Sequence, residues 1–536
     1  MKSLKKYVYI GLPILGVLFY ICYLQRSAVD MIYSDYIRLI NSYLPDVWNP
    51  EKFFVPDLLT RMPISYLGRA INVTFFDYSV TFDRMLSVLS FGASALILGV
   101  YCMKHQVGLG WFTATMVFMF SLNKWEMLYN STGWCHFMAF ACFFYNYLVL
   151  DRVYRNEGKR GDLVRLALLP PFTTVVVAGP YCAIYSMTLF IAYGFIWVQN
   201  CVVKRRVKLE TAEAGERKFG SVAGEKAGRM PGILTAIFGG ERCKLTNKQL
   251  AILVISVLWP LLAFIWSNSQ AVYEHSGAVE GSMIGTFFQE PEFFLKFFLK
   301  SFASMVFGVE FISRHMSSLP DMFWYVLGLV VFTSYFLALW MNFHYGIYKK
   351  TIFPLMFLAG GGMNHLIVLV SRWIFMKESY GMSSRYALQY QIGILGILMT
   401  FGLVYRSSAA RAAGEKTEAA SGARTVGENT EAVNGAQAAD GKSRRSNMVH
   451  KNVAVQILAL AIAAMFVGGN VATTVDEYDY GQHRKNHNLE VKERLLDFEN
   501  QDEDTLKRDL EYSKDGKKEA LRILRDNGWN IFRDAE

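Results

Sequence analysis

The sequence predicts an all-α, polytopic membrane protein with about eleven transmembrane helices and a small helical tail outside the membrane. Two observations point to this class. Hydrophobic residues make up 53% of the 536 positions, whereas charged residues are held to 19%. Apolar runs of about 20 residues, the length that crosses the hydrocarbon core of a bilayer, also recur along the chain. This composition excludes a disordered chain, a collagen-like repeat and a disulfide scaffold.

The first apolar run extends from Tyr7 to Leu24 and follows three lysines. It could be a signal peptide or a first transmembrane helix. The helix is favoured, because the run exceeds the ~7 to 15 residues of a signal core and no clear small-x-small cleavage site follows it. The further predicted spans are residues 82–102, 107–122, 133–150, 166–178, 180–199, 249–268, 321–341, 351–370, 386–405 and 453–473.

The stretch 166–199 is the least regular of these. Pro170, Pro171 and Pro180 interrupt it, and its first apolar run is short. It could therefore form two spans or one re-entrant or broken helix.

The loops between the spans differ in their content of Lys and Arg, and basic residues resist translocation. Loops 151–165, 200–248 and 406–451 are basic and fall on one side of the membrane. We therefore expect a multi-pass membrane protein with a cytoplasmic N-terminus. These loops account for the net charge of +10 without a nucleic-acid partner, and none is expected. The expected outer segments are 25–81, 123–132, 269–320, 371–385 and the tail from 474.

Two domains are predicted. The transmembrane domain, 1–473, includes the outer loop 25–81 and two cytoplasmic linkers, 200–248 and 406–451, which are rich in Ala, Gly, Glu, Lys and Ser over much of their length. The tail, 474–536, is polar with leucines at helical spacing, and predicts a soluble, extracytoplasmic helical unit.

Acidic residues gather in the first outer loop, where Asp30, Asp35 and Glu51 follow the first span. A carboxylate at the membrane edge can accept a proton from a sugar hydroxyl or hold a divalent cation, and the low dielectric raises its pKa. The alternative is that these are solvated loop acids.

A short outer connection carries Trp125 and Glu126. Trp125 fits an interfacial aromatic belt. Glu126 could take part in chemistry at the level of the first loop, or could simply pair with its neighbour Lys124.

The outer loop 371–385 carries Arg372 and Arg385, against the trend for basic residues to stay inside. A guanidinium binds phosphate or diphosphate through two parallel hydrogen bonds. Structural pairing with Asp30, Asp35 or Glu51 is the alternative.

Other common motifs are missing from the sequence. The histidines and seven cysteines show no metal-ligand spacing, and there is neither a phosphate-binding loop nor a Gly-x-Ser-x-Gly elbow. The sequence therefore gives no support to a histidine metal site, an ATP-driven pump or an α/β-hydrolase.

Several short motifs occur in a fixed order: Asp35, then Asn49-Pro50-Glu51-Lys52, then Trp125-Glu126, then Ser384-Arg385-Tyr386, and finally the soluble tail. In this layout the chain resembles a broad family of bacterial multi-pass membrane proteins that look like GT-C glycosyltransferases. The resemblance covers nearly the whole chain, and its Ser-Arg-Tyr triplet is the cleanest match.

The resemblance implies a polyprenyl-phosphate sugar donor at the outer face of the membrane and an envelope glycan or lipid acceptor. On this model Asp35 is the general base, with Asp30 or Glu51 orienting it. The donor phosphate would be held by Arg385, Arg372, Tyr386 and Lys52, while Glu126 and Trp125 contact the acceptor or support the site. No cofactor is implied with certainty, although two or three acids could bind Mg²⁺ or Mn²⁺.

Two other functions remain open from the sequence. A polysaccharide polymerase or ligase acting on a lipid diphosphate would depend more on the outer arginines than on Asp35. A glycolipid flippase or exporter would need charges lining a path through the membrane, and few charges lie inside the predicted spans.

Overall fold

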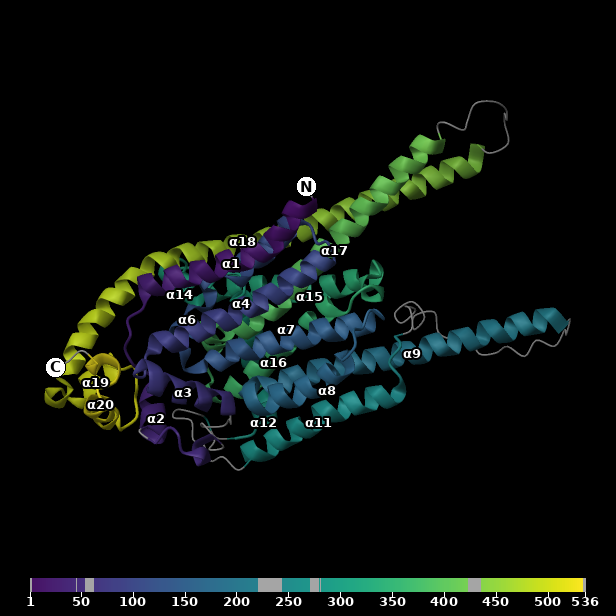
Figure 1. Ribbon diagram of the computed structural model, residues 1–536. Coiled ribbons are helices and arrows are strands. Elements are labelled where there is room, and N and C mark those ends of the chain that lie inside the picture. Colours follow the sequence, from purple (N-terminus) through teal and green to yellow (C-terminus); the bar gives the residue numbers. More distant parts are fainter. Residues whose placement is uncertain are drawn as a thin grey trace.

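The structure is a computed structural model that describes residues 2–44, 46–53, 62–219, 243–269, 279, 281–422 and 435–533. These residues form an elongated bundle of helices (Figure 1), and no strand occurs within the described ranges. Among them, eight helices are long and apolar enough to cross a bilayer, which indicates a multi-pass membrane protein. They are α1 (Lys2–Ser27), α4 (Val80–Lys104), α9 (Cys182–Phe219), α11 (Asn247–Ser269), α15 (Asp321–His344), α16 (Phe353–Arg372), α17 (Ser384–Gly422) and α18 (Gly435–Leu496).

The other three predicted spans are also helical, but they are not among these eight. They correspond to α5 (Leu109–Met119), α7 (Trp134–Tyr154) and α8 (Asp162–Phe172). With 11 residues each, α5 and α8 are shorter than the ~17 residues that a span needs. The structure therefore supports eight spans, and the number of about eleven stays a prediction.

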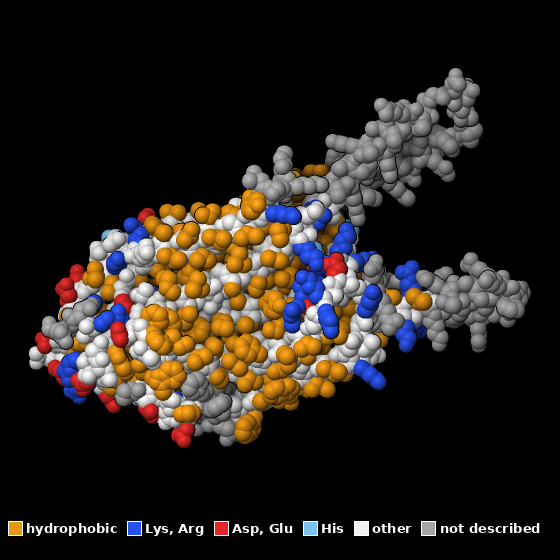
Figure 2. Space-filling view, in the orientation of Figure 1, with side chains coloured by type: hydrophobic (Ala, Val, Ile, Leu, Met, Phe, Trp, Pro, Cys, Tyr) orange, Lys and Arg blue, Asp and Glu red, His pale blue; other side chains and the backbone are white. Residues whose placement is uncertain are grey.

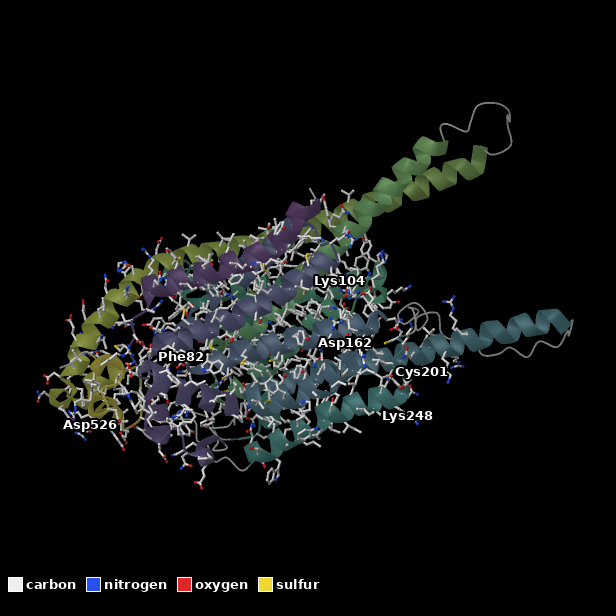
Figure 3. The ribbon with its side chains drawn as sticks, viewed as in Figure 1. Phe82, Lys104, Asp162, Cys201, Lys248 and Asp526 are labelled. Atoms are coloured by element: carbon white, nitrogen blue, oxygen red, sulfur yellow. The ribbon has the colours of Figure 1, made fainter. Side chains whose placement is uncertain are left out.

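The irregular stretch 166–199 forms two helices. A π-helical turn (Thr173–Val177) follows α8, and α9 begins at Cys182. Asp162, at the start of α8, and Cys201, in α9, lie toward the same end of the bundle (Figure 3). The chain therefore reverses between the two helices, near Gly179.

The two ends of the bundle differ. One end, here called the tail end, gathers α2 (Asp35–Tyr43), α3 (Pro63–Phe76), α19 (Glu503–Asp509) and α20 (Lys517–Asp526) (Figure 1). The opposite end, here called the basic end, carries most of the visible Lys and Arg side chains, beyond a broad apolar band (Figure 2). Lys104 and Lys248 lie there (Figure 3). An apolar band between two polar ends matches a protein that spans a bilayer.

The tail docks onto the segment that follows α1. Ser34 donates its backbone N–H to the carbonyl of Leu510 at 2.6 Å, and Asn41 Nδ2 donates to the carbonyl of Gly516 at 2.9 Å. Next to these contacts, the segment after α1 and the tail pack together in one apolar cluster. Its members include Met31, Ile32, Tyr36, Ile37, Val491, Leu495, Leu506, Leu521, Leu524, Ile531 and Phe532.

Helices also occupy segments that the sequence predicted as loops or linkers. Helix α18 continues without a break from the last span to Leu496, so the tail is a direct extension of that span. Helices α9, α17 and α18 extend into the two predicted linkers, while residues 220–242 and 423–434 of these linkers lie outside the described residues. The loop 269–320 contains α12 (Met283–Gln289), α13 (Pro291–Ala303) and α14 (Val309–His315), and the loop 123–132 contains α6 (Trp125–Tyr129).

Helix α17 forms the centre of the bundle, because residues 387–404, its apolar middle, are all buried. It packs closely against α16, where Gly361 lies against the backbone of Gly393. Small residues at such crossings let two helix backbones approach closely inside a membrane. This packing fixes the start of α17, including Ser384 and Arg385, at the tail end.

Candidate functional site

A polar pocket of about 570 Å³ lies at the tail end, between the membrane helices and the docked tail. It is here called the tail pocket. Six separate parts of the chain meet in it: the segment after α1, α6, α14, the start of α17, the part of α18 that leads into the tail, and the end of α19. The lining residues are Met31, Tyr33, Trp125, Glu126, Tyr129, Asn130, Glu310, Arg314, Arg385, Tyr480, His483, Arg484, His487, Asn488, Asp509 and Glu511.

An ion pair between Arg385 and Glu126 joins α17 to α6 inside this pocket. Arg385 Nε donates to Glu126 Oε1, and Ser384 Oγ donates to Glu126 Oε2 at 2.8 Å. The side chains remain 50% and 22% exposed, respectively. The guanidinium is therefore positioned by the carboxylate while much of its surface still faces the pocket.

A second guanidinium, that of Arg484, lies against Trp125. Its central carbon is 3.7 Å from the centre of the Trp125 ring, which is a cation–π contact. Arg484 NH1 also donates to Glu477 Oε1 at 2.7 Å and to the hydroxyl of Tyr23 at 3.1 Å. Because Glu477 is almost fully buried, this pair fixes the orientation of Arg484.

The third guanidinium, that of Arg314, comes from α14. Its Nε donates to Asp476 Oδ2 at 2.9 Å, and its central carbon lies 4.5 Å from the centre of the Tyr480 ring. All three arginines of the tail pocket are thus held by carboxylates, and two of them also lie against aromatic rings.

Two oxygen atoms in the pocket have unused hydrogen-bonding capacity. Glu310 Oε2 and the hydroxyl of Tyr33 are buried and find no hydrogen-bond partner within the described part of the chain. Burial raises the pKa of Glu310, and the nearby charge of Glu126 adds to this effect. Glu310 is therefore a carboxyl group that can hold a proton at a higher pH than a solvated glutamate.

Lys124 does not pair with Glu126. Its Nζ turns into the protein and donates to the carbonyls of Met119 and Ser121, each at 2.8 Å. Burial lowers the pKa of Lys124 from 10.5 to about 7. The alternative of a Lys124–Glu126 pair is therefore wrong, because Glu126 has Arg385 as its partner.

The two aspartates of the first loop have different surroundings. Asp35 begins α2, two residues after Tyr33 of the pocket lining, and its charge acts on Arg385. Asp30 accepts from Ser79 Oγ at 2.8 Å and from the backbone N–H of Thr81 at 3.1 Å. These bonds tie Asp30 to the start of α4, where it satisfies one backbone N–H that the helix leaves open.

Four other predicted site residues lie outside the lining of the tail pocket. Glu51 is exposed in a short 3₁₀ turn (Pro50–Phe53), and Lys52 Nζ donates to the carbonyl of Ser42 at 3.0 Å. Arg372 lies over the ring of Tyr386, with 5.8 Å between its central carbon and the ring centre. The structure therefore brings Trp125, Glu126 and Arg385 together and places Asp35 within electrostatic reach of Arg385. The other predicted residues are not among the lining residues of the tail pocket.

A metal site is not apparent. Among the residues that the structure describes, no group of three or more His, Cys, Asp or Glu side chains is placed to hold an ion. In the tail pocket the carboxylate of Glu126 is engaged by Arg385, and that of Asp509 by Arg494 at 2.8 Å. The expectation of Mg²⁺ or Mn²⁺ thus gains no support from the donor groups in this pocket.

Sequence reasoning missed Glu310, Arg314 and Arg484. Glu310 and Arg314 lie in a segment that was expected to be an irregular loop, and it is the unpredicted helix α14 that brings them to the pocket. For Arg484 a signal was present. Tyr478, Tyr480 and Arg484 follow directly on the last apolar span, and aromatic and basic residues are enriched at such membrane boundaries.

No family model, curated protein or solved structure matches the chain. The chemistry of the tail pocket therefore has to be inferred from its own residues.

Proposed function

We propose that the chain is a membrane glycosyltransferase that transfers a sugar from a polyprenyl-phosphate donor to an envelope glycan or lipid acceptor. The reaction would take place in the tail pocket, at the outer face of a bacterial cytoplasmic membrane. One observation carries the proposal: the ion-paired Arg385 and Glu126 line a single polar pocket at one end of the membrane bundle, together with Arg314 and Arg484.

The donor side of the reaction needs a cation close to the membrane. A polyprenyl chain stays in the bilayer, so its phosphate lies at the interface, and we place it at the tail end of the bundle, where the tail pocket lies. The half-exposed guanidinium of Arg385 suits this phosphate. As the sugar leaves, negative charge grows on the phosphate, and a guanidinium that is already in position stabilises it.

The acceptor side needs a carboxylate that takes the proton of the attacking hydroxyl. We assign this role to Asp35, because it stands beside the pocket and within electrostatic reach of Arg385. The acceptor oxygen forms a bond to the anomeric carbon, the bond from that carbon to the phosphate oxygen breaks, and the phosphate keeps the electron pair. Glu310 is a further carboxyl group in the pocket lining, and its raised pKa suits a group that donates a hydrogen bond instead.

The distribution of charge supports the proposed orientation. Exposed lysines and arginines gather at the basic end (Figure 2), where the first residues of α1 also lie (Figure 1). Basic residues mark the cytoplasmic side of membrane proteins. The tail end, with its pocket, would then face outward, and the N-terminus would lie in the cytoplasm.

A second candidate is a polysaccharide polymerase or ligase that acts on a lipid diphosphate. The presence of three guanidiniums in one pocket favours it, because a diphosphate carries more charge than a monophosphate and can use more than one of them.

Binding of the lipid separates these candidates. The purified protein in detergent micelles is titrated with undecaprenyl phosphate and with undecaprenyl diphosphate, for the wild type and for Arg385→Ala, Arg314→Ala and Arg484→Ala. If the protein is a glycosyltransferase, we expect it to bind undecaprenyl phosphate tightly, and we expect this binding to depend mainly on Arg385. Preference for the diphosphate with equal dependence on all three arginines would favour the polymerase or ligase, and binding of neither lipid would count against both.

A further inference from the structure

A second polar pocket lies at the basic end, opposite the tail pocket, and the proposed function does not use it. It has a volume of about 390 Å³ and is here called the basic pocket. Five lysine and arginine side chains line it, and Glu157 is the single carboxylate among the lining residues. The five are Lys104, Arg155, Lys349, Lys350 and Arg406.

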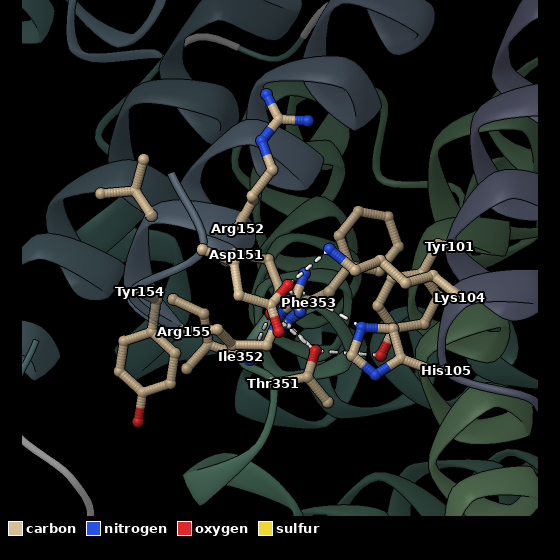
Figure 4. Close-up of polar contacts among 12 residues, drawn as sticks. Tyr101, Lys104, His105, Asp151, Arg152, Tyr154, Arg155, Thr351, Ile352 and Phe353 are labelled. Carbon is tan, nitrogen blue, oxygen red and sulfur yellow. Dashed lines mark hydrogen bonds and ion pairs between the residues drawn. The ribbon is translucent and has the colours of Figure 1, made fainter. Parts of the chain in front are cut away.

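The pocket is built on a buried carboxylate, that of Asp151 (Figure 4). Asp151 Oδ1 accepts from Thr351 Oγ1 at 2.6 Å and from the backbone N–H of Ile352 at 2.8 Å, at the start of α16. Asp151 Oδ2 accepts from Arg155 Nε at 2.9 Å. These bonds fix the turn that carries Lys349 and Lys350, so their position does not depend on a ligand.

The basic side chains differ in how far they are already paired. Lys104 Nζ lies 2.6 Å from Glu157 Oε2, Arg155 is held by Asp151, and Arg406 NH2 donates to Gln106 Oε1 at 2.8 Å. Lys349 and Lys350 are exposed and form no ion pair with the described residues. The pocket therefore has positive charge left over for an anion.

An apolar groove lies next to this pocket. It has a volume of about 280 Å³ and lies between α9, α15 and α16. Tyr348 connects the two features: its carbonyl accepts from the hydroxyl of Tyr154, which lines the basic pocket, at 2.8 Å. The Tyr348 ring packs against Phe343 and Phe195, which line the groove, with ring centres 5.2 and 6.1 Å apart.

An occupant of both features needs an anionic head and an apolar chain. The groove faces the bilayer, since Ile191 and Phe336 in its lining are more than half exposed and belong to membrane-spanning helices. Lysines at a membrane surface attract anionic lipid headgroups, and basic pockets between transmembrane helices bind such headgroups.

We propose that this site binds an anionic phospholipid, with the headgroup phosphate between Lys349 and Lys350 and one acyl chain in the apolar groove. The ligand is thus a component of the membrane itself, and the site is separate from the tail pocket.

Native mass spectrometry of the full-length protein in detergent micelles tests this proposal. Dioleoyl phosphatidylglycerol, the neutral dioleoyl phosphatidylcholine and inorganic phosphate serve as probes. Phosphatidylglycerol is expected to bind at least about tenfold more tightly than phosphatidylcholine. The reason is that each lysine near an anionic headgroup adds to the free energy of binding through electrostatic attraction. The double variant Lys349→Ala, Lys350→Ala is expected to lose that preference.

A matched control is the double variant Lys159→Ala, Arg160→Ala, which removes the same charge at the same end from exposed residues outside the pocket. It is expected to bind as the wild type does, and an equal loss in this control would overturn the proposal in favour of general surface charge. Filling the groove with Ala359→Phe is expected to weaken phosphatidylglycerol binding. If Ala359→Phe has no effect, or if inorganic phosphate displaces the lipid at comparable concentration, the site is one for a soluble anion and the lipid proposal fails.

Discussion

Arg385 Nε donates a hydrogen bond to Glu126 Oε1, although the two residues are 259 positions apart in the sequence. One residue stands at the start of the long central helix α17, and the other lies in the five-residue helix α6. The pair thus brings together two segments in which the sequence indicated functional residues separately. Because both side chains remain partly exposed, the pair can rearrange when an anion enters the tail pocket.

Removing this guanidinium should impair donor binding more than folding. Arg385→Ala is expected to weaken the binding of undecaprenyl phosphate by about tenfold or more, because a charge-assisted hydrogen bond to the phosphate is lost. The melting temperature should change little, since partly exposed ion pairs add little stability. Isothermal titration of the protein in micelles measures the affinity, and a thermal scan measures the stability.

Arg372→Ala is the matched control for this variant. Arg372 lies in the same part of the chain but outside the lining of the tail pocket, over the ring of Tyr386. If Arg372→Ala weakens binding as strongly as Arg385→Ala does, the phosphate does not bind where we place it.

Docking of the tail should depend on Asn530. This buried residue accepts from the backbone N–H of Ile32 at 3.2 Å and donates from Nδ2 to the carbonyl of Tyr78 at 3.0 Å. Asn530→Ala is expected to cost about 2 kcal/mol of docking free energy, because two buried hydrogen bonds are lost. Limited proteolysis should then cut the tail faster, whereas the exposed Asn527→Ala should leave the rate unchanged. Equal rates for wild type and Asn530→Ala would show that these bonds do not hold the tail.

Stability should rise with pH above neutrality because of Lys124. Burial lowers its pKa from 10.5 to about 7, so between these values the unfolded chain binds more protons than the folded one, and stability increases with pH. The melting temperature in micelles should therefore rise from about pH 7 to about pH 9. Lys124→Met should flatten this rise, whatever it does to the melting temperature at pH 7. A rise of the same size in both proteins would assign the pH dependence to other groups.

The proposed orientation can be tested by labelling. In a protein with the exposed Cys22 and Cys201 changed to alanine, Ser379→Cys reports on the tail end and Lys159→Cys on the basic end. A membrane-impermeant maleimide should label Ser379→Cys in intact cells and Lys159→Cys only after permeabilisation, because the basic end is expected to face the cytoplasm. The reverse pattern would place the tail pocket in the cytoplasm and exclude an outer-leaflet donor.

The apolar runs predicted the membrane helices well, because a long hydrophobic segment has few alternatives to a helix in a bilayer. Every predicted span overlaps a helix, although 107–122 contains only the 11-residue α5. The shorter helices of the loops were not predicted. Helices such as α2 and α14 have nine and seven residues, too few for hydrophobic spacing to stand out, and tertiary contacts stabilise them instead.

The candidate site was predicted only in part, for a related reason. Trp125, Glu126 and Arg385 stood out because polar and charged residues interrupt apolar sequence there. Glu51 was chosen as an acid of the first outer loop and Lys52 because of the resemblance, and neither ground determines which way a loop turns. Arg484 reaches the pocket because α18 continues past the membrane as one helix, which the polar composition after Val475 did not reveal.

The most direct test of the central claim is an analysis of sugar composition and linkage in the envelope glycans of a strain that lacks the protein. The strain is complemented with the wild type, with Asp35→Asn or with Glu310→Gln, and membrane insertion of each variant is checked by immunoblot. We predict that a sugar is lost in the deletion strain, that the wild type restores it, and that Asp35→Asn does not, although this variant is inserted normally. Full restoration of the sugar by Asp35→Asn would show that Asp35 is not the general base. An unchanged glycan in the deletion strain would contradict the proposed glycosyltransferase function.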